Sequence, residues 1–337
     1  MFKKEKFEMK KLEKYPNISV VIPAYNDAKT LDVIIPAILN QKYDGDIEII
    51  VVDDCSMDNT IEVAKKHGVE VIVHNKNMGL ASSINDGMKN AKYELVCVIE
   101  DDVLLVDDEW FKKLVPYLVL NDDVVCVSSP LILTKEVYNK LGFWEKAMFA
   151  WELKEEEEIG DEVSVVEYSE GSCDIWKKDV LLKIGGHDAE TYRVSCEDVD
   201  ICKRAAQKGY KVVSVPVPVY HLHSSHATGL SKILFFKGAH LSEGQGVLFR
   251  KYRFRAWSID NQIFKTTAVI ALFIPINVIR LLGIGYIAAT VFGNAIRSYK
   301  VMRDPRVLFL MPPVKLLDYF LNVYYFWKGF ITGRQRK

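Results

Sequence analysis

The sequence predicts an α/β fold with a doubly wound, mainly parallel sheet, followed by an apolar helical region. Short runs rich in Val and Ile are continuously apolar, which is typical of strands covered on both faces. These runs alternate with longer stretches of helical periodicity, which favours parallel strands joined by crossover helices. After Phe249, long apolar stretches stand among basic residues, which predicts a separate C-terminal part.

The predicted strands and helices follow one another from residue 18 onward. Strands are expected at residues 18–22, 47–52, 69–73, 94–99 and 124–127. Helices are expected at residues 28–40, 58–67, 80–91 and 108–120. Sheets of this kind bind ligands beyond the carboxyl ends of their strands, so we expect the chemistry at those ends.

Polar residues stand at three of these strand ends. The first strand leads into Pro23-Ala24-Tyr25-Asn26-Asp27, the second into Asp53-Asp54-Cys55-Ser56, and the fourth into Glu100-Asp101-Asp102. A single acidic strand end usually caps a helix, and Asp58 stands in such a position. Three acidic ends at one edge are unfavourable unless a cation or hydrogen-bond donors compensate them.

Six motifs occur in a characteristic order. They are VVIPAYND (20–27), VVDDCSMDNT (51–60), NKNMGLASSINDG (75–87), IEDDV (99–103), GSCDIWKKDVLLKIGGHD (171–188) and CEDVDICKRAAQKGYKV (196–212). In these motifs the chain resembles the family 2 glycosyltransferases, which have the GT-A fold and use nucleotide diphosphate sugars. The resemblance covers residues 17–225, about two thirds of the chain.

The resemblance assigns the first four motifs to the nucleotide sugar. The residues it implies are Pro23, Tyr25, Asn26, Asp53, Asn77, Gly79, Glu100 and Asp101. Asp53 would accept hydrogen bonds from the base, although a loop cap would also explain a carboxylate there. Asn77 and Gly79 fit a turn that approaches the ligand, where glycine supplies conformational freedom. Gly87 lies on the following helix and is expected to serve packing.

The acidic triplet at residues 100–102 stands where the family has its Asp-x-Asp motif. Mg²⁺ and Mn²⁺ prefer oxygen ligands, so we expect one of these divalent metals as cofactor. Asp102 is the predicted metal ligand, because it matches the last acidic position of the motif. Glu100 replaces the usual first Asp and keeps its charge on a longer side chain. An exposed acidic turn is the alternative.

Asp198 matches the catalytic base of the family. Such a carboxylate takes the proton from the acceptor hydroxyl as this hydroxyl attacks the anomeric carbon. Asp198 precedes an expected helix at residues 199–208, so helix capping is a competing role, and the helix dipole would favour the ionised carboxylate. Gly171 and Glu197 are assigned to the acceptor side. Asp200 is expected to be a solvated or structural helix position.

His221 and His223 follow a strand-like segment. Two residues apart on an extended chain, they point to one face. The resemblance places His221 near the metal or the diphosphate, and His223 is assigned to the acceptor side. Histidines without a ligand are the alternative. The Gln-x-x-Arg-Trp motif of processive polysaccharide synthases is absent, which favours the transfer of a single sugar.

The C-terminal part has an unusual charge. Its last 88 residues hold 15 basic and 3 acidic residues, a net of +12, whereas the other residues hold 29 basic and 42 acidic ones, a net of −13. Two apolar stretches, 266–279 and 281–296, flank Arg280, and neither reaches the roughly 20 residues that span a bilayer. We expect interfacial or re-entrant helices, with the aromatic residues of 314–330 at headgroup depth. A packed helical subdomain is the alternative.

These patterns divide the chain into a charged N-terminal extension (1–16), a GT-A domain (17–228) and a basic, apolar helical region (229–337). The six cysteines form no C-x-x-C pair, and the N-terminus has no apolar stretch typical of a signal peptide. We therefore expect a cytosolic catalytic domain at the cytoplasmic face of the cell membrane. A nucleic-acid partner is not expected, because long apolar runs do not suit such a surface.

The predicted activity is that of an inverting, metal-dependent glycosyltransferase of the hexosyltransferase type. It would move one sugar from a nucleotide diphosphate sugar to a lipid-linked or glycan acceptor in surface polysaccharide, glycolipid or glycoprotein assembly. A sugar nucleotidyltransferase and a non-enzymatic membrane scaffold are the alternatives.

Overall fold

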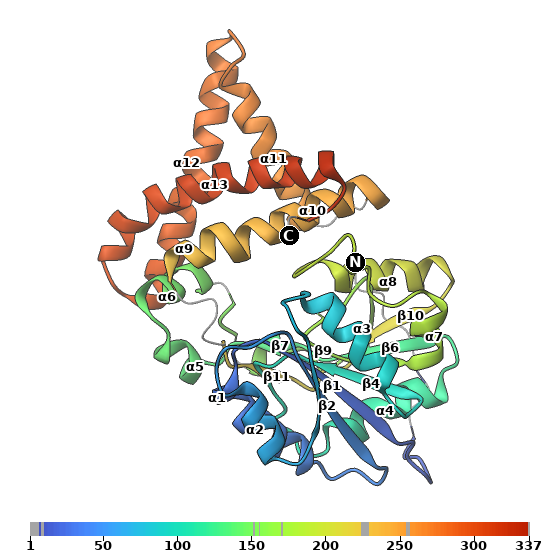
Figure 1. Ribbon diagram of the computed structural model, residues 1–337. Coiled ribbons are helices and arrows are strands. Elements are labelled where there is room, and N and C mark those ends of the chain that lie inside the picture. The colour runs from blue at the N-terminus through green and yellow to red at the C-terminus, as the bar shows by residue number, and fades with distance from the viewer. Residues whose placement is uncertain are drawn as a thin grey trace. The chain divides into compact units, whose positions relative to one another are not determined.

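The computed structural model describes residues 7, 10–150, 152–154, 156–169, 171–223, 229–253 and 257–335. The chain forms two compact units, and Figure 1 shows their elements. The first unit contains residues 1–137, 154–189 and 197–226, and the second contains residues 138–153, 190–196 and 227–337. Two segments that the sequence assigns to the GT-A domain therefore belong to the second unit. Half of the expected N-terminal extension, residues 1–6 and 8–9, lies outside the described residues.

A mixed sheet forms the centre of the first unit, with the strand order β3-β2-β1-β4-β9-β6-β10-β8. Its strands are β1 (Ile18–Ala24), β2 (Ile47–Asp53), β3 (Glu70–Val73), β4 (Leu95–Ile99), β6 (Val124–Ser128), β8 (Ser164–Val166), β9 (Cys173–Lys177) and β10 (Lys211–Ser214). Strands β1 to β4 are parallel, as the sequence predicts. Strand β9 lies antiparallel between β4 and β6, and β8 is antiparallel to β10, so the sheet is less uniformly parallel than expected.

Helices cover both faces of this sheet. They are α1 (Ala28–Leu39), α2 (Thr60–Lys66), α3 (Leu80–Asn90), α4 (Trp110–Leu120), α7 (Lys178–Lys183) and α8 (Glu197–Gln207). Residues of α1, α2 and α4 join the core on one face, and residues of α3, α7 and α8 join the core on the other. In α1 the fully buried residues Leu31, Ile34, Ile35 and Ile38 recur at helical spacing, which is why this segment folds as a helix against a sheet. The predicted α/β fold is confirmed.

One glycine and one carboxylate show how local chemistry fixes these helices. A Cβ on Gly87 of α3 would lie 2.2 Å from a methyl carbon of Val21, so this glycine serves packing against β1, as predicted. Asp58 accepts the N–H of Thr60 at 3.1 Å and that of Ala28 at 3.2 Å, the first residues of α2 and α1. The N-cap position of α2 is occupied by Asn59 and not by Asp58, so Asp58 satisfies the helix start from one residue further out than predicted.

A second, small sheet lies beside the main one. It has the order β5-β11-β7, from β5 (Val103–Leu104), β11 (Val219–His221) and β7 (Leu131–Ile132).

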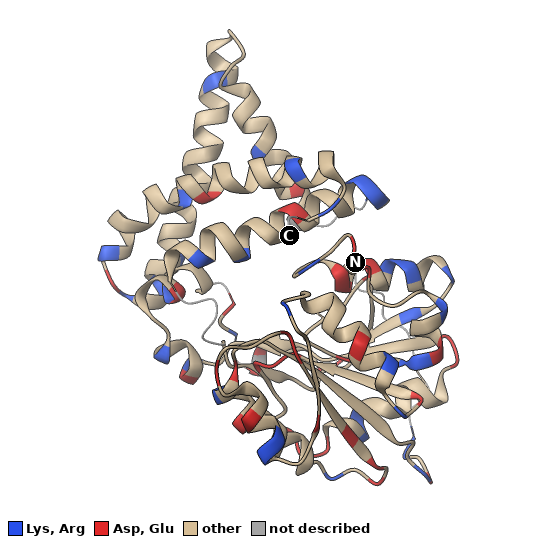
Figure 2. Cartoon of the chain, in the orientation of Figure 1, with Lys and Arg blue, Asp and Glu red and all other residues tan. Residues whose placement is uncertain are grey.

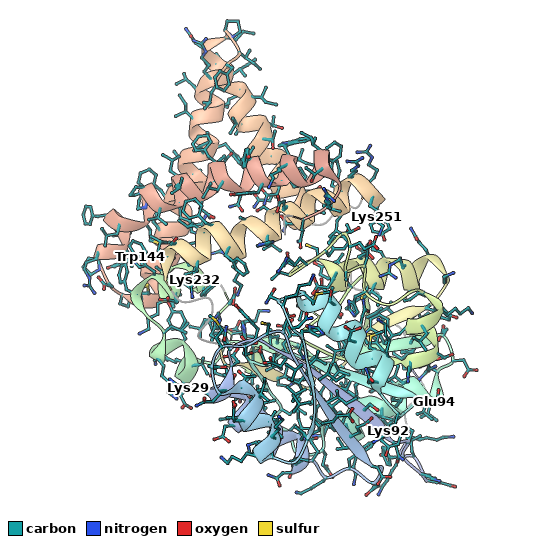
Figure 3. The ribbon with its side chains drawn as sticks, viewed as in Figure 1. Lys29, Lys92, Glu94, Trp144, Lys232 and Lys251 are labelled. Atoms are coloured by element: carbon teal, nitrogen blue, oxygen red, sulfur yellow. The ribbon has the colours of Figure 1, made fainter. Side chains whose placement is uncertain are left out.

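An ion pair joins the main sheet at the edge where β2 and β4 begin. Figure 3 labels Lys92 and Glu94 just before β4, and Lys92 Nζ lies 2.9 Å from Glu48 Oε1 near the start of β2.

The second unit is helical. Its helices are α6 (Phe143–Phe149), α9 (Leu230–Lys232), a π-helical turn (Ile233–Gly238), α10 (Ala239–Tyr252), α11 (Trp257–Ala271), α12 (Asn277–Met302) and α13 (Arg306–Thr332); α5 (Lys135–Lys140) connects the two units. Lys232 and Lys251 mark the two ends of the α9–α10 segment in Figure 3. Helices α10 and α13 cross at backbone contact, because a Cβ on Gly246 would lie 1.9 Å from the carbonyl oxygen of Phe326. Only glycine permits this approach.

The two apolar stretches of the C-terminal region are divided differently than the sequence suggests. The break lies at residues 272–276, around Pro275, and Arg280 stands in the first turn of α12, where its Nε donates to Ile274 O at 2.8 Å. Helix α12 therefore runs for 26 residues, and α13 runs for 27 through Pro312 and Pro313. The apolar C-terminal helices are confirmed, but both are longer than the predicted segments.

By length and composition, α12 and α13 are both able to cross a membrane. Only 22% of the apolar window of α12 and 17% of that of α13 are buried, which is unlike the core helix of a soluble protein. Leu281 and Leu282 of α12 are 66% and 69% exposed. Figure 2 shows the α11–α12 hairpin almost without coloured charged residues.

Candidate active site

The loops after β1 and β2 are joined at the carboxyl edge of the sheet. Ala24 and Asp53 are partners in the parallel register of these strands, and Asp54 N donates to Ala24 O at 2.8 Å. Asn26 ties the loops together, since its N–H donates to Ser56 Oγ at 2.8 Å and its Oδ1 accepts the Met57 N–H at 2.6 Å. The first two motifs therefore form one structure.

Four described residues other than glycine, within the region 17–225 that resembles the family, have left-handed backbone conformations. Their φ angles are 56° for Asn26, 67° for Cys55, 71° for Cys196 and 53° for His223. Residues other than glycine adopt such angles at a cost of about 1–3 kcal/mol, and they concentrate at functional sites. These four positions coincide with the segments that the sequence assigns to substrates.

Asp54, rather than Asp53, organises the third motif. Asp54 Oδ1 accepts the Met78 N–H at 2.6 Å and lies 2.8 Å from His74 Nδ1, and Oδ2 accepts the Gly79 N–H at 2.8 Å. Gly79 has a φ of 92°, which explains the glycine, but its N–H is used within the protein. Asn77 Nδ2 lies 3.4 Å from the carbonyl oxygen of Asp54. Nothing in the motif itself distinguishes the two adjacent aspartates.

Asp53 lies at the end of β2 and is fully buried. Its Oδ2 accepts the Ser56 N–H at 3.1 Å, as the loop-cap alternative requires. Its Oδ1 has no hydrogen-bond partner among the described residues. Buried acceptors are normally paired, so this oxygen remains available for a donor such as a ring N–H. The side chain therefore fits both roles considered for it.

The acidic triplet follows β4 and is held by its neighbours. The Glu100 N–H donates to Ser172 O at 2.9 Å, and Asp101 Oδ2 accepts the Tyr25 N–H at 3.0 Å. Burial, with the nearby carboxyls of Asp27 and Asp102, raises the pKa of Asp101 well above its usual value. Pro23, in β1, is buried, whereas the Tyr25 side chain is 38% exposed. The concentration of acidic groups expected here is present.

Asp102 and His221 are brought together by the small sheet. Val103 of β5 pairs with His221 of β11, and Leu222 N donates to Asp102 O at 2.7 Å. As a result, His221 Nε2 lies 3.2 Å from Asp102 Oδ2. The ring of His223 is tilted on that of His221, with 4.0 Å between centroids, so the two histidines lie side by side as predicted.

This donor set fits a divalent metal. The carboxylate of Asp102 is a hard oxygen ligand suited to Mn²⁺ and Mg²⁺, and an imidazole nitrogen is accepted by Mn²⁺ more readily than by Mg²⁺. The two ligand atoms already converge within 3.2 Å. The carboxyls of Glu100 and Asp101 add negative charge beside them. A cation would relieve the repulsion within this cluster.

Asp198 lies in the first turn of α8, against Gly171. A Cβ on Gly171, whose φ is 75°, would lie 2.6 Å from Asp198 Cβ and 3.0 Å from its Oδ2. Gly171 directly precedes Ser172, which accepts the Glu100 N–H. The fourth, fifth and sixth motifs thus meet through these residues at one edge of the sheet. This arrangement requires β9 to run antiparallel, since its first residue then lies beside the last residue of β4.

The carboxyls around Asp198 differ in environment. Glu197 is buried, and desolvation together with the charge of Asp198 raises its pKa well above the usual value. Asp174 on β9 is also buried, and desolvation raises its pKa to about 7, although Ser169 Oγ donates to it at 2.6 Å. Asp200 is fully buried and paired with Arg204 Nε at 2.7 Å, so it is a structural residue and not a solvated one. Asp174 was not anticipated from the sequence.

A helix-covered sheet with acidic loops at the carboxyl ends of its strands is the architecture of GT-A glycosyltransferases. Residues 19–165 match the family described as Glycosyl transferase family 2. Over these residues the chain is therefore similar to the glycosyltransferases of family 2.

Relatives and solved structures agree with this assignment. Poly-β-1,6-N-acetyl-D-glucosamine synthase of Staphylococcus epidermidis is 25% identical over 178 residues, which cover 51% of this chain and 42% of the synthase. The uncharacterised protein MJ1222 of Methanocaldococcus jannaschii is 29% identical over 70% of this chain and 95% of its own length. The mannosyltransferase PcManGT from Pyrobaculum calidifontis, solved with GDP-Man and Mn²⁺, has a TM-score of 0.59 and 16% identity over 95% of this chain and 91% of its own. That likeness shows a shared fold.

Proposed function

We propose that the protein is an inverting, metal-dependent glycosyltransferase that moves one sugar from a nucleotide diphosphate sugar to a lipid-linked or glycan acceptor. The observation that carries this proposal is the contact between Gly171 and Asp198, beside the hydrogen bond from Glu100 N to Ser172 O. Together, these two contacts connect the acidic triplet 100–102 with Asp198 at the start of α8. The similarity to a polysaccharide synthase supports a role in polysaccharide assembly.

Asp198 is suited to act as the general base. Two adjacent carboxyls do not both ionise readily in a buried place, and burial makes Glu197 the one that retains its proton. Asp198 is only partly buried and belongs to the first turn of α8, where the helix dipole favours a negative charge. It would accept the proton of the acceptor hydroxyl as the new glycosidic bond forms and the nucleoside diphosphate leaves.

The donor would be held by the loops after β1, β2 and β4. Asp53 Oδ1 would accept a hydrogen bond from the base, and Asp102 with His221 would hold the metal, which neutralises charge on the diphosphate. Tyr25, Asn26, Asn77 and Gly79 stand in the loops that surround this region. PcManGT, which was solved in complex with GDP-Man and Mn²⁺, supports a nucleotide sugar donor and a divalent metal.

The proposed activity is tested with purified protein, Mn²⁺, a panel of nucleotide sugars and a membrane lipid extract as acceptor. We expect release of nucleoside diphosphate coupled to incorporation of one sugar, and inversion of the anomeric configuration in the product. Asp198→Asn should lower the transfer rate by roughly 10²- to 10⁴-fold with little change in donor affinity. Unchanged transfer by the folded variant would remove Asp198 from the mechanism. Pyrophosphate release from a nucleoside triphosphate would favour a nucleotidyltransferase instead.

We further propose that α11, α12 and α13 attach the enzyme to the cytoplasmic face of a membrane. The exposed apolar side chains of α12 support this proposal. A helix that exposes so many large apolar residues to water is unfavourable on a soluble protein. Basic residues flank the apolar windows, and they would interact with anionic headgroups.

Sedimentation with vesicles tests the attachment. The full chain should bind vesicles of phosphatidylcholine, and more strongly those that also contain phosphatidylglycerol. The double variant Leu281→Asp/Leu282→Asp should lose binding to both. Leu182→Asp changes a leucine of the first unit that is 54% exposed, and it should bind like the wild type. Equal vesicle binding by the double variant would contradict the proposed role of α12.

A further inference from the structure

The segment immediately before Asp198 belongs to the helical unit. Residues 190–196 are part of the second unit, and the chain enters the first unit at Glu197, where α8 begins. No helix or strand is assigned between residues 191 and 196. A segment without regular structure receives no ladder of backbone hydrogen bonds, so other groups must fix its conformation.

The side chain of Gln335 supplies these hydrogen bonds. Its Oε1 accepts the Arg193 N–H at 2.7 Å and the Val194 N–H at 3.2 Å. The two N–H groups of its Nε2 are shared among three acceptors, Ser195 O at 2.8 Å, Ser195 Oγ at 2.9 Å and His240 O of α10 at 3.0 Å. The Gln335 backbone N–H adds a bond to Thr191 O at 2.9 Å. Gln335 is 5% exposed, so both its donor and its acceptor are used where water is excluded.

Helix α10 leaves room for this arrangement at one glycine. A Cβ on Gly244 would lie 2.6 Å from Gln335 Nε2 and 2.8 Å from Cys196 Sγ. Cys196 is buried with a φ of 71°, a conformation that persists only where its surroundings enforce it. The segment 191–196 is therefore held from two sides, by Gln335 and by α10, up to the residue that is bonded to Glu197.

We propose that Gln335 is a positioning residue for the catalytic base Asp198. It acts through the segment 191–196, which it fixes against α10 and which is joined by a peptide bond to Glu197, the first residue of α8. This inference rests on the proposed function, because it takes Asp198 as the base. Through this segment, a residue that closely follows α13, which ends at Thr332, would influence the transfer step.

The first test compares Gln335→Ala with Gln262→Ala in the full chain. Gln262 is a matched control, because it is also 5% exposed but donates its amide hydrogen bond to Gln245 Oε1 of α10 at 3.0 Å and not to the segment 191–196. We expect Gln335→Ala to lower kcat by roughly 10- to 100-fold with donor KM within about 2-fold, as for a displaced catalytic group. The acidic limb of its kcat–pH profile should also shift. Gln262→Ala should change neither.

Gly244→Ala perturbs the same contacts from the α10 side, and it should reproduce the kcat loss and the pH shift. It gives a second, independent variant in case Gln335→Ala does not fold. If either folded variant retained the kcat and pH profile of Gln262→Ala, the positioning role would be refuted.

Hydrogen exchange separates this inference from the proposed function. In Gln335→Ala, deuterium uptake should rise in peptides covering residues 190–198, since the Arg193 and Val194 amides lose their acceptor, and it should not rise there in Gln262→Ala. Unchanged uptake would show that Gln335 does not fix the segment, whatever the enzyme catalyses. Increased uptake together with a wild type that transfers no sugar would reject the proposed function, and with it a role of this contact in catalysis.

Discussion

Replacing Gly171 with alanine should impair sugar transfer, because the added methyl group would collide with the proposed base. The new Cβ would lie 2.6 Å from Asp198 Cβ, whereas ordinary contacts begin at 3.4 Å, so the two groups must separate by 3.4 − 2.6 = 0.8 Å. A displacement of about 1 Å at a catalytic group can lower the rate by roughly 10²-fold. We therefore expect kcat to fall by roughly 10- to 100-fold.

The same substitution should also lower stability. A non-glycine residue at a φ of 75° is strained by about 1–2 kcal/mol, and overpacking adds about 1–3 kcal/mol where neighbours do not yield. If Asp198 moves aside, the overpacking is relieved and the loss appears in kcat. If α8 stays in place, the loss appears in the free energy of unfolding.

Gly185→Ala is the matched control for this experiment. Gly185 has a φ of 89°, so alanine there is strained in the same way, but no atom lies within 4 Å of its added Cβ. Steady-state transfer with varied donor and urea unfolding should be measured for both variants. The reasoning is refuted if Gly171→Ala matches Gly185→Ala in both kcat and unfolding free energy.

Three further predictions concern the carboxylates. Asp102→Asn should raise the Mn²⁺ concentration needed for half-maximal transfer by at least about 10-fold, and an unchanged Mn²⁺ dependence would exclude Asp102 as a ligand. Asp54→Ala should raise donor KM and cost about 2–4 kcal/mol of stability, because the Met78 and Gly79 amides lose their carboxylate acceptor. An unchanged donor KM in the folded variant would show that the 74–79 loop takes no part in donor binding. Asp174→Asn should remove a pH dependence of stability. Burial raises the pKa of Asp174 from 3.8 to about 7, so the unfolded chain loses this proton at a lower pH than the folded protein does. The free energy of unfolding of the wild type should therefore fall between about pH 4 and pH 7, by on the order of 4 kcal/mol. Urea unfolding across this range should show a flatter profile for Asp174→Asn, and parallel profiles would be evidence against the raised pKa.

The parallel half of the sheet is predictable from sequence because its strands are buried on both faces. Continuous Val and Ile runs occur in β1, β2 and β4, and the structure assigns these strands within two residues of their predicted ends. Strand β9 has no such run. Its five residues include Asp174 and Lys177, and its antiparallel direction depends on partners far away in the chain. Local periodicity does not contain that information.

The C-terminal helices depart from prediction for a different reason. Arg280 divides the two apolar stretches and suggested a break there, and prolines such as Pro312 and Pro313 ordinarily disrupt a helix. In the folded protein, α13 continues through both prolines, and Arg280 bonds to the carbonyl of Ile274 in the turn before α12. Packing of α10 on α13 at Gly246 supplies stabilisation that propensity does not include.

The motifs predicted which candidate residues lie close together but not the hydrogen bonds among their neighbours. Asp102, His221, Gly171 and Asp198 were named from sequence, and their contacts form because separate strands end at one edge. The role of Asp54 in holding the 74–79 loop depends on which carboxylate of an adjacent pair turns toward that loop. Gln335 lies about 140 residues from the segment it contacts, so no local pattern could connect them.

The position of β9 has a consequence for how the protein folds during synthesis. Strands β1 to β4 are complete when residue 99 has been made, but the partner of β4 on its open side is β9, which ends at residue 177. Until then the nascent chain presents an unpaired apolar strand edge, and such edges promote association between chains. Synthesis at about 5–20 residues per second would leave this edge open for several seconds. The emerging protein should therefore be most vulnerable to aggregation, and most dependent on chaperones, between these two points of translation.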